Sequence, residues 1–262
     1  MSLTLTNIPS IMRAQGWTHG ASLLGKWFHR NASRYPHYTA PDTTTITINW
    51  VLQYPKPRLL YNSIFTERVW ANDAARKVLA QRLLAWGKLT GFQENFEQTT
   101  KPATVLEREY INYRAFGGGY SGYSGYYGSS GYSSSGASGQ AVNTYSGVLS
   151  GGLNDLIAAL GAFTFRIVID GSVIPVLSGG REVTVTKVGV FVRDSFDFEG
   201  FQFLGFWNDS THSVSAVNPL AGTPVFNSTL RDYRDRYHMG GDFMVFSDVK
   251  VTTLSPPHKF ML

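Results

Sequence analysis

Hydrophobic residues recur at helical and at strand spacings in different parts of this 262-residue chain. In 17–28 they return every three or four positions, which predicts an amphipathic helix. A second helix is predicted over 66–89, with Thr66 as its N-cap. Between them, 45–52 alternates between apolar and polar side chains. This alternation predicts a short strand that Pro55 and Pro57 end.

The last third of the chain has the period of β-strands. After a short helix predicted at 153–160, apolar residues alternate with polar ones from Phe163 to Ile169, and Asp170-Gly171 is typical of a two-residue hairpin turn. Further strands are predicted at 172–177, 182–193 with a bulge near Gly189, 201–207 and 243–251.

Residues 117–152 interrupt this pattern. They contain no charged residue and 12 of the 27 glycines, and include the run GGGYSGYSGYYGSSGYSSSGASG. A flexible linker is predicted, with a tyrosine-rich surface that packs on a partner as the alternative. We expect a mainly helical region at 1–116 with one short strand, this low-complexity segment at 117–152, and an antiparallel β-rich domain at 153–262. The fold class is α+β, with the strands in a sandwich or a partly open barrel.

Composition and charge exclude several kinds of site. The absence of cysteine removes disulfides, zinc–thiolate sites, iron–sulfur clusters and thiol nucleophiles. The net charge of +5 divides into 14 basic and 7 acidic residues in 1–116 and 9 basic and 11 acidic in 153–262. The basic residues form no dense tract, so nucleic-acid binding is disfavoured. No phosphate-binding loop, nucleophile elbow or dinucleotide motif occurs, and we predict neither a cofactor nor a metal site.

The first ten residues lack the features of a secretory signal, and no window approaches the roughly 20 apolar residues of a membrane span. We therefore expect a protein that is cytoplasmic in the producing cell, with any export through a route that needs no signal peptide.

Candidate chemistry lies in polar clusters of the β-rich part. In RDSFDFE at 193–199, Asp194 and Asp197 have the spacing of carboxylates that share a proton, hold a hard cation or act as acid and base. An ordinary turn at a strand end uses the same residue types. We assign these two aspartates as candidate catalytic residues.

The segment RDYRDRYH at 231–238 is denser in charge. On a helix, Arg231 and Asp235 are neighbours one turn apart, as are Arg234 and His238, so pairing within the helix accounts for much of the charge. In the functional interpretation, Arg231, Arg234 and Asp235 form the substrate-binding group, in which an arginine clamps a phosphate or carboxylate. His238 then transfers a proton as a third catalytic residue.

Four segments together resemble an uncharacterised bacterial family of unknown function, encoded mainly in proteobacteria and often near type VI secretion genes. They are INWVLQY at 48–54, ALGAFTFRIVIDG at 159–171, GVFVRDSFDFEGFQFLGFWN at 189–208 and FNSTLRDYRDRYHMGGDFMVFSDVK at 226–250. The resemblance covers nearly the whole chain except the low-complexity segment. It implies no specific chemistry, only a link to interbacterial competition.

A fainter similarity is to colicin M-type toxins, which cleave a lipid-linked peptidoglycan precursor. Their Asp-x-Tyr-Asp motif aligns with Asp194-Ser195-Phe196-Asp197, where phenylalanine replaces the tyrosine. The His-Arg pair of those toxins is absent, so His212 or His238 would have to replace the histidine.

Two functions are therefore expected from the sequence. The first is a leaderless effector or toxin-like protein, with hydrolysis of an envelope component as its candidate activity and a secretion-apparatus or immunity protein as partner. The alternative is a non-catalytic structural or adaptor module of a secretion particle. Its binding surface would combine the tyrosine-rich segment with aromatic residues of the sheet, namely Phe201, Phe203, Phe206 and Trp207.

Overall fold

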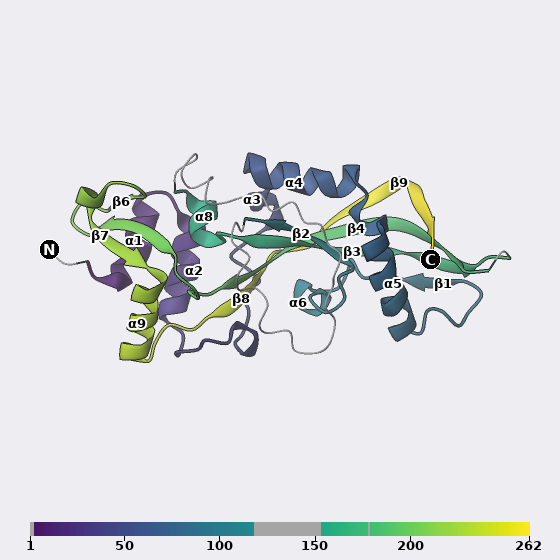
Figure 1. The fold of residues 1–262 in the computed structure, drawn as a ribbon, viewed down its shortest axis with the longest axis horizontal. Coiled ribbons are helices and arrows are strands. Elements are labelled where there is room, and N and C mark those ends of the chain that lie inside the picture. Colours follow the sequence, from purple (N-terminus) through teal and green to yellow (C-terminus); the bar gives the residue numbers. More distant parts are fainter. Residues whose placement is uncertain (1–2, 118–152, 178) are drawn as a thin grey trace.

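A long antiparallel hairpin forms the axis of an elongated molecule, with helices gathered at one end and others packed along its length, α4 above and α6 below it in the view of Figure 1. The computed structural model describes residues 3–117, 153–177 and 179–262. The tyrosine-rich surface predicted in 117–152 falls almost entirely outside the described residues. The helical elements before the hairpin are η1 (Leu5–Asn7), α1 (Ile8–Ala14), α2 (Thr18–Phe28), η2 (Pro36–Tyr38), α3 (Ile48–Val51), α4 (Pro55–Thr66), η3 (Val69–Ala71), α5 (Asp73–Ala85), α6 (Ala103–Leu106) and α8 (Asp155–Ala159).

The large sheet has six strands and is antiparallel throughout. The hairpin of β3 (Phe163–Pro175) and β4 (Arg181–Phe196) lies at its centre. The outer edge of β3 is shared by β2 (Asn112–Phe116) and β1 (Glu94–Phe96). The outer edge of β4 is shared by β9 (Lys250–Met261) and β8 (Phe243–Phe246).

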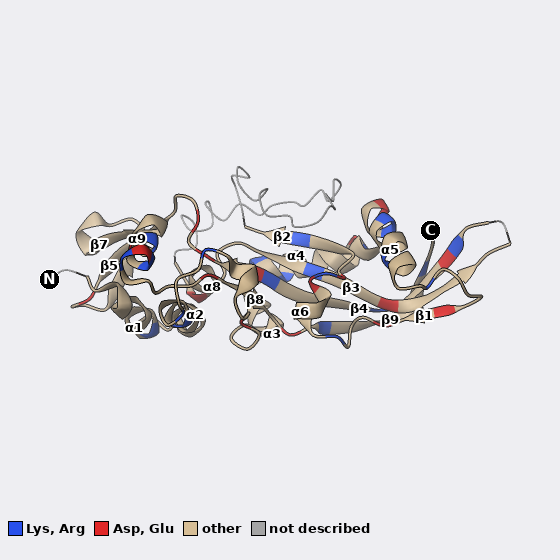
Figure 2. Ribbon diagram, turned by 90° about the horizontal axis from the view of Figure 1, so that it is seen from below, with Lys and Arg blue, Asp and Glu red and all other residues tan. Residues whose placement is uncertain are grey.

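A second sheet lies beside the N-terminal helices. It has the order β6-β5-β7, formed by β5 (Phe203–Asn208), β6 (Ser213–Ser215) and β7 (Thr223–Phe226). The turn η4 (Pro219–Ala221) precedes β7, and α9 (Asn227–Tyr237) follows it. The predicted α+β class is confirmed, because helices precede antiparallel sheets that do not close into a barrel. Basic and acidic positions are scattered along the whole molecule (Figure 2).

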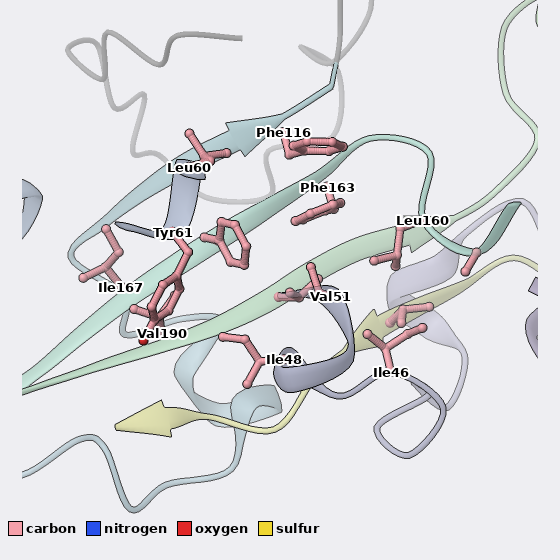
Figure 3. Packing of buried hydrophobic residues seen from close by; sticks show 14 of the residues in the cluster. Ile46, Ile48, Val51, Leu60, Tyr61, Phe116, Leu160, Phe163, Ile167 and Val190 are labelled. Atoms are coloured by element: carbon pink, nitrogen blue, oxygen red, sulfur yellow. The ribbon is translucent and has the colours of Figure 1, made fainter. Parts of the chain in front are cut away.

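One main hydrophobic core joins the helices to one face of the large sheet. Figure 3 shows Ile48 and Val51 of the helical region near Phe163 and Val190 of the hairpin, and all four belong to this core. A smaller cluster on the other face includes Phe191, whose neighbours in β4 point inward to the main core. Since β1 and β2 precede residues 117–152 and pair with β3 after them, both sides of that segment build one sheet. The division into domains at that segment stays a prediction.

Several predicted elements agree with the structure. The helix predicted at 17–28 is α2, and that at 153–160 is α8. Four strands also lie where alternation predicted them, although 243–251 divides into β8 and β9. That division follows from Ser247, whose hydroxyl accepts the backbone N–H of Val192 at 2.8 Å and replaces a carbonyl of the strand ladder.

The strand predicted at 45–52 is wrong, because this segment is a turn leading into the short helix α3. Two carboxylates take the backbone amides that a strand would have offered to a neighbour. Asp42 accepts from Thr45 N at 2.8 Å, and Asp248 accepts from Ile48 N at 2.7 Å. Ile46 and Ile48 are buried here, as they would be on the inner face of a strand. The apolar pattern therefore did not distinguish a strand from this turn and short helix.

The helix start predicted at Thr66 is also wrong. Thr66 ends α4, which begins at Pro55 in the first helical position, where proline loses no hydrogen bond. Arg68 then adopts a left-handed conformation with φ of 49°, and Asn72 caps α5 by accepting from Ala75 N at 2.9 Å. The single helix start predicted at Thr66 is therefore replaced by the end of α4, a turn, and the start of α5 at Asp73.

The hairpin predicted at Asp170-Gly171 does not form, since β3 runs through this pair and turns only after Pro175. Asp170 is buried and accepts hydrogen bonds from the backbone amides of Gln98 and Thr99, at 2.6 and 2.8 Å. A Cβ on Gly171 would lie 2.1 Å from the carbonyl oxygen of Thr184. Asp170 thus anchors the loop at Gln98 and Thr99 to β3, and Gly171 allows β3 and β4 to approach each other closely.

The bulge predicted near Gly189 lies a few residues earlier. The pairings of β4 with both β3 and β9 skip Thr186. Gly189 instead allows close packing, because a Cβ there would lie 2.9 Å from the side chain of Val168.

Replacing Gly171 by alanine is expected to lower the free energy of unfolding by about 2–4 kcal/mol, because two backbones must separate to admit the methyl group. The matched control is Gly25→Ala in α2, where nothing lies within 4 Å of the new Cβ. This change is expected to stabilise the protein by up to about 1 kcal/mol through helix propensity. Urea unfolding measures both, and equal effects would contradict the assignment of Gly171.

Candidate functional site

A buried ion pair links the C-terminal helix to the N-terminal helices. Arg234 of α9 is 1% exposed and donates from Nη1 to Oδ2 of Asp242 at 2.9 Å. Arg234 also donates to the carbonyl of Ser33 at 3.1 Å, and the indole of Trp27 donates to Oδ1 of Asp242 at 2.8 Å. Both carboxylate oxygens are therefore occupied, as a buried charge requires.

The local sequence explains how these groups meet. Leu230 and Arg234 lie one turn apart on the inner face of α9 and are both buried. Gly240 and Gly241 then let the chain pass against α2, since a Cβ on Gly240 would lie 2.4 Å from the Trp27 ring. This approach brings Asp242 to the indole nitrogen.

The carboxylate of Asp197 affects two others, that of Asp242 in this pair and that of Asp194. Burial raises the pKa of Asp242 to about 6, and the negative charge of Asp197 adds to the rise, while Trp27 and Arg234 lower it. Burial also raises the pKa of Asp194 well above its ordinary value, and Asp197 again adds to the rise. Asp197 is half-buried and accepts from the hydroxyl of Ser195 at 2.6 Å.

The other predicted residues have separate partners. Arg231 donates to the carbonyls of Phe198 and Gly200, at 2.5 and 2.7 Å, and so fixes the loop between β4 and β5. Asp235 is exposed and accepts two hydrogen bonds from Arg34, at 2.8 and 2.9 Å.

His238 ends α9 in a left-handed conformation, and its side chain is exposed. In the described part of the chain, no hydrogen bond or ion pair joins its imidazole to Asp194 or Asp197. The structure brings Asp197 close enough to affect the pKa of both Asp194 and Asp242, and leaves His238 without a bond to the two predicted aspartates. The catalytic assignment of Asp194, Asp197 and His238 stays a prediction.

A histidine–aspartate pair that sequence reasoning missed lies elsewhere, between α2 and α8. Nδ1 of His19 lies 2.7 Å from Oδ2 of Asp155, although 136 positions separate the two residues. The imidazole stacks on Trp50 with the ring centres 3.9 Å apart. Because a carboxylate only accepts, Nδ1 carries a proton, and in the neutral form of the imidazole Nε2 is the acceptor.

Asp155 also has a structural task. It accepts the backbone amides of His19 and Gly20, at 3.2 and 2.8 Å, and so caps α2, whose own N-cap residue Trp17 offers no side-chain bond. Asn154 caps α8 itself by accepting from Ile157 N. The available sequence signal was Asn154-Asp155 at the start of α8, which is typical of a helix N-terminus. Nothing in that dipeptide indicates that Asp155 caps α2 and not α8.

In the described ranges, no group of three histidine, aspartate or glutamate side chains could hold a metal ion. None of the helices in these ranges is long and apolar enough to span a membrane.

A family model described as a family of unknown function, DUF6402, matches residues 3–222 and 221–262. The chain belongs to this family. Membership of an uncharacterised family, expected from the four resembling segments, is thus confirmed for DUF6402. Neither the curated proteins nor the solved structures contain a match to the chain. The secretion-gene neighbourhood and the likeness to colicin M-type toxins stay predictions.

Asp194→Asn is expected to make this DUF6402 protein more stable than the wild type at pH 8, with a smaller difference at pH 5. The folded state holds the Asp194 proton more tightly than the unfolded state, because burial raises its pKa. Wild-type stability therefore falls as the pH rises from the unfolded pKa to the folded one, by up to about 1.4 kcal/mol per pH unit. Asparagine does not titrate and lacks this slope.

Urea unfolding from pH 4 to pH 8 measures the difference, and Asp232→Asn, at an exposed position of α9, is the control. Asp242 titrates in the wild type and in both variants, so its contribution to the pH dependence of stability cancels when the curves are compared. Parallel curves for wild type and Asp194→Asn would contradict a pKa of Asp194 that burial raises.

Proposed function

We propose that the protein is a non-catalytic adaptor module that binds a protein component of a secretion particle. The binding surface is the aromatic face of the small sheet, defined as Phe201, Phe203, Phe206 and Phe226. One observation carries the proposal, namely that these four rings form a connected cluster at the surface. The ring centres lie 5.4 Å apart for Phe201 and Phe226, 5.3 Å for Phe203 and Phe226, and 4.9 Å for Phe203 and Phe206.

The exposure of this face supports a binding role. Phe201 is 84% exposed, the other three rings are half-buried, and η4 packs beside β5 with Leu220 94% exposed. Aromatic side chains are enriched at the centres of protein interfaces, because they bury a large area at a small cost in rotamer entropy. Trp207 does not belong to this face, since it is buried and packs edge-on against Trp17. The sequence had placed it there.

The partners of the predicted substrate-binding residues also favour an adaptor. Arg234 is enclosed with Asp242, and Arg231 fixes a loop. Asp235 pairs with Arg34 at the surface. In this arrangement the charged cluster stabilises the junction between α9 and α2 and does not offer an arginine to a substrate.

Phe201→Ser is expected to weaken a stoichiometric complex with purified secretion-particle components about 30-fold or more, which is the loss of a central aromatic contact worth about 2 kcal/mol. The matched control is Phe92→Ser, which alters a ring 90% exposed in the segment between α5 and β1. Size-exclusion chromatography with light scattering, followed by calorimetry, measures the complex. Equal loss in both variants, or unchanged binding by Phe201→Ser, would contradict the proposal.

The second candidate is an enzymatic effector of interbacterial competition, favoured by the His19–Asp155 pair. A carboxylate that orients Nδ1 leaves Nε2 ready to accept a proton from water or a hydroxyl, which is the arrangement of a general base. The imidazole keeps 27% of its surface exposed.

If this candidate is correct, the wild type will arrest growth when expressed in the cytoplasm or periplasm of a susceptible cell, and His19→Gln will not. His29→Gln, at an exposed position just after α2, is the control and should remain toxic. A wild type that is harmless in both compartments, or a toxic His19→Gln of normal stability, would exclude the effector hypothesis in this form.

A further inference from the structure

A buried indole N–H without an acceptor and several cationic or imidazole side chains gather where η3 and α5 meet the end of β9. The indole ring of Trp70 lies 6.4 Å from the imidazole of His258, nearly perpendicular to it. His258 in turn lies 6.0 Å from the ring of Phe260, and the guanidinium of Arg76 lies over that ring at 5.1 Å. In both views, α5 lies beside the C-terminal end of the chain (Figure 1 and Figure 2).

The donors have no negative partner in the described part of the chain. Trp70 is 3% exposed, and its Nε1 has no hydrogen-bond acceptor. Within the same residues, no carboxylate is close enough to form an ion pair with Arg68, Arg76 or His258. A buried N–H without an acceptor costs about 1–3 kcal/mol, so an incoming acceptor would recover that free energy.

The backbone holds these donors in fixed positions. Arg68 has a left-handed conformation, which is costly for a residue with a Cβ, and its carbonyl accepts from Ala71 N at 2.8 Å. Asn112 of β2 donates to the carbonyl of Val69 at 2.9 Å and holds the same turn. Arg76 donates through Nε to Ala71 O at 2.8 Å, which leaves its two terminal nitrogens for a ligand.

The electrostatics of His258 agree with this arrangement. Burial lowers the pKa of His258, and the positive charges of Arg68 and Arg76 lower it further. Both guanidinium groups therefore act on the imidazole, although Arg68 belongs to the turn after α4 and Arg76 to α5. An anion between them would reverse this unfavourable interaction.

We propose that Arg68, Arg76, His258 and the Trp70 indole form a binding site for a phosphate group, supplied as inorganic phosphate or as a phosphate monoester. Two guanidinium groups approaching from different elements suit a tetrahedral dianion, whose oxygens accept from several directions, better than a planar carboxylate with a single charge. The site lies at the large sheet and does not depend on the aromatic face of the small one.

The test is a titration of the full chain with inorganic phosphate, at constant ionic strength maintained with chloride, followed by ¹H–¹⁵N NMR. The Trp70 indole signal, assigned with Trp70→Phe, is expected to shift and saturate. Arg68→Gln is expected to raise the Kd about tenfold or more, since it removes a charge-assisted hydrogen bond. Arg68 is exposed and has no side-chain partner within the described residues, so this variant should fold normally.

Lys77→Gln is the matched control, because Lys77 is an exposed cation one position after Arg76 on α5. It is expected to change the Kd less than about twofold, as a distant screened charge does. A Trp70 signal that does not move, or equal weakening by Arg68→Gln and Lys77→Gln, would overturn the site in favour of general charge attraction. Titration with glycerol phosphate shows which source binds more tightly, and saturable binding of either one supports the proposal.

Discussion

The ion pair of Arg234 and Asp242 is the interaction on which the arrangement of the helical end depends. An arginine excluded from water needs an opposite charge close by. Asp242 supplies that charge and accepts from Nη1 of Arg234, whereas Nε and Nη2 have no acceptor within the described residues. Asp242 also accepts from Trp27, the largest fully buried side chain of the helical end. One carboxylate therefore joins α2 to α9 and to the chain leading into β8, although 215 positions separate Trp27 from Asp242.

The large sheet depends in a similar way on residues that are far apart in the chain. β1 and β2 complete one edge of the hairpin from before residues 117–152, while β8 and β9 complete the other edge from the C-terminus. The loop before α6 is attached to β3 by Asp170, and the segment before α3 is shaped by Asp42 and Asp248. Carboxylates that accept backbone amides, buried for Asp42 and Asp170 and exposed for Asp248, thus recur as the means of holding loops in place.

This use of polar groups bears on function. Most charged residues that the sequence marks as chemical candidates have a structural partner, whereas the aromatic face of the small sheet and the donors around His258 have exposed or unpaired groups. Exposed aromatic rings, and cations that have no carboxylate partner among the described residues, cost free energy in the isolated molecule. A partner that covers the rings or supplies an anion would recover that free energy. For this reason the binding hypotheses follow from the structure more directly than the catalytic ones.

The sequence by itself determined the α+β class, the positions of α2, α8 and the strands β3, β4, β5 and β8, and the polar clusters around Asp194 and Arg234, because these depend on local periodicity and composition. Only the tertiary structure decided that 45–52 forms a turn and the short helix α3, that Asp170-Gly171 lies inside a strand, and that Trp207 faces the core. The physical reason is the same in each case. The deciding partner is a carboxylate, a backbone amide, a carbonyl or a ring from another segment. Asp155, for example, caps α2 by accepting from the amide of His19, which lies 136 positions earlier. No local sequence pattern contains that information.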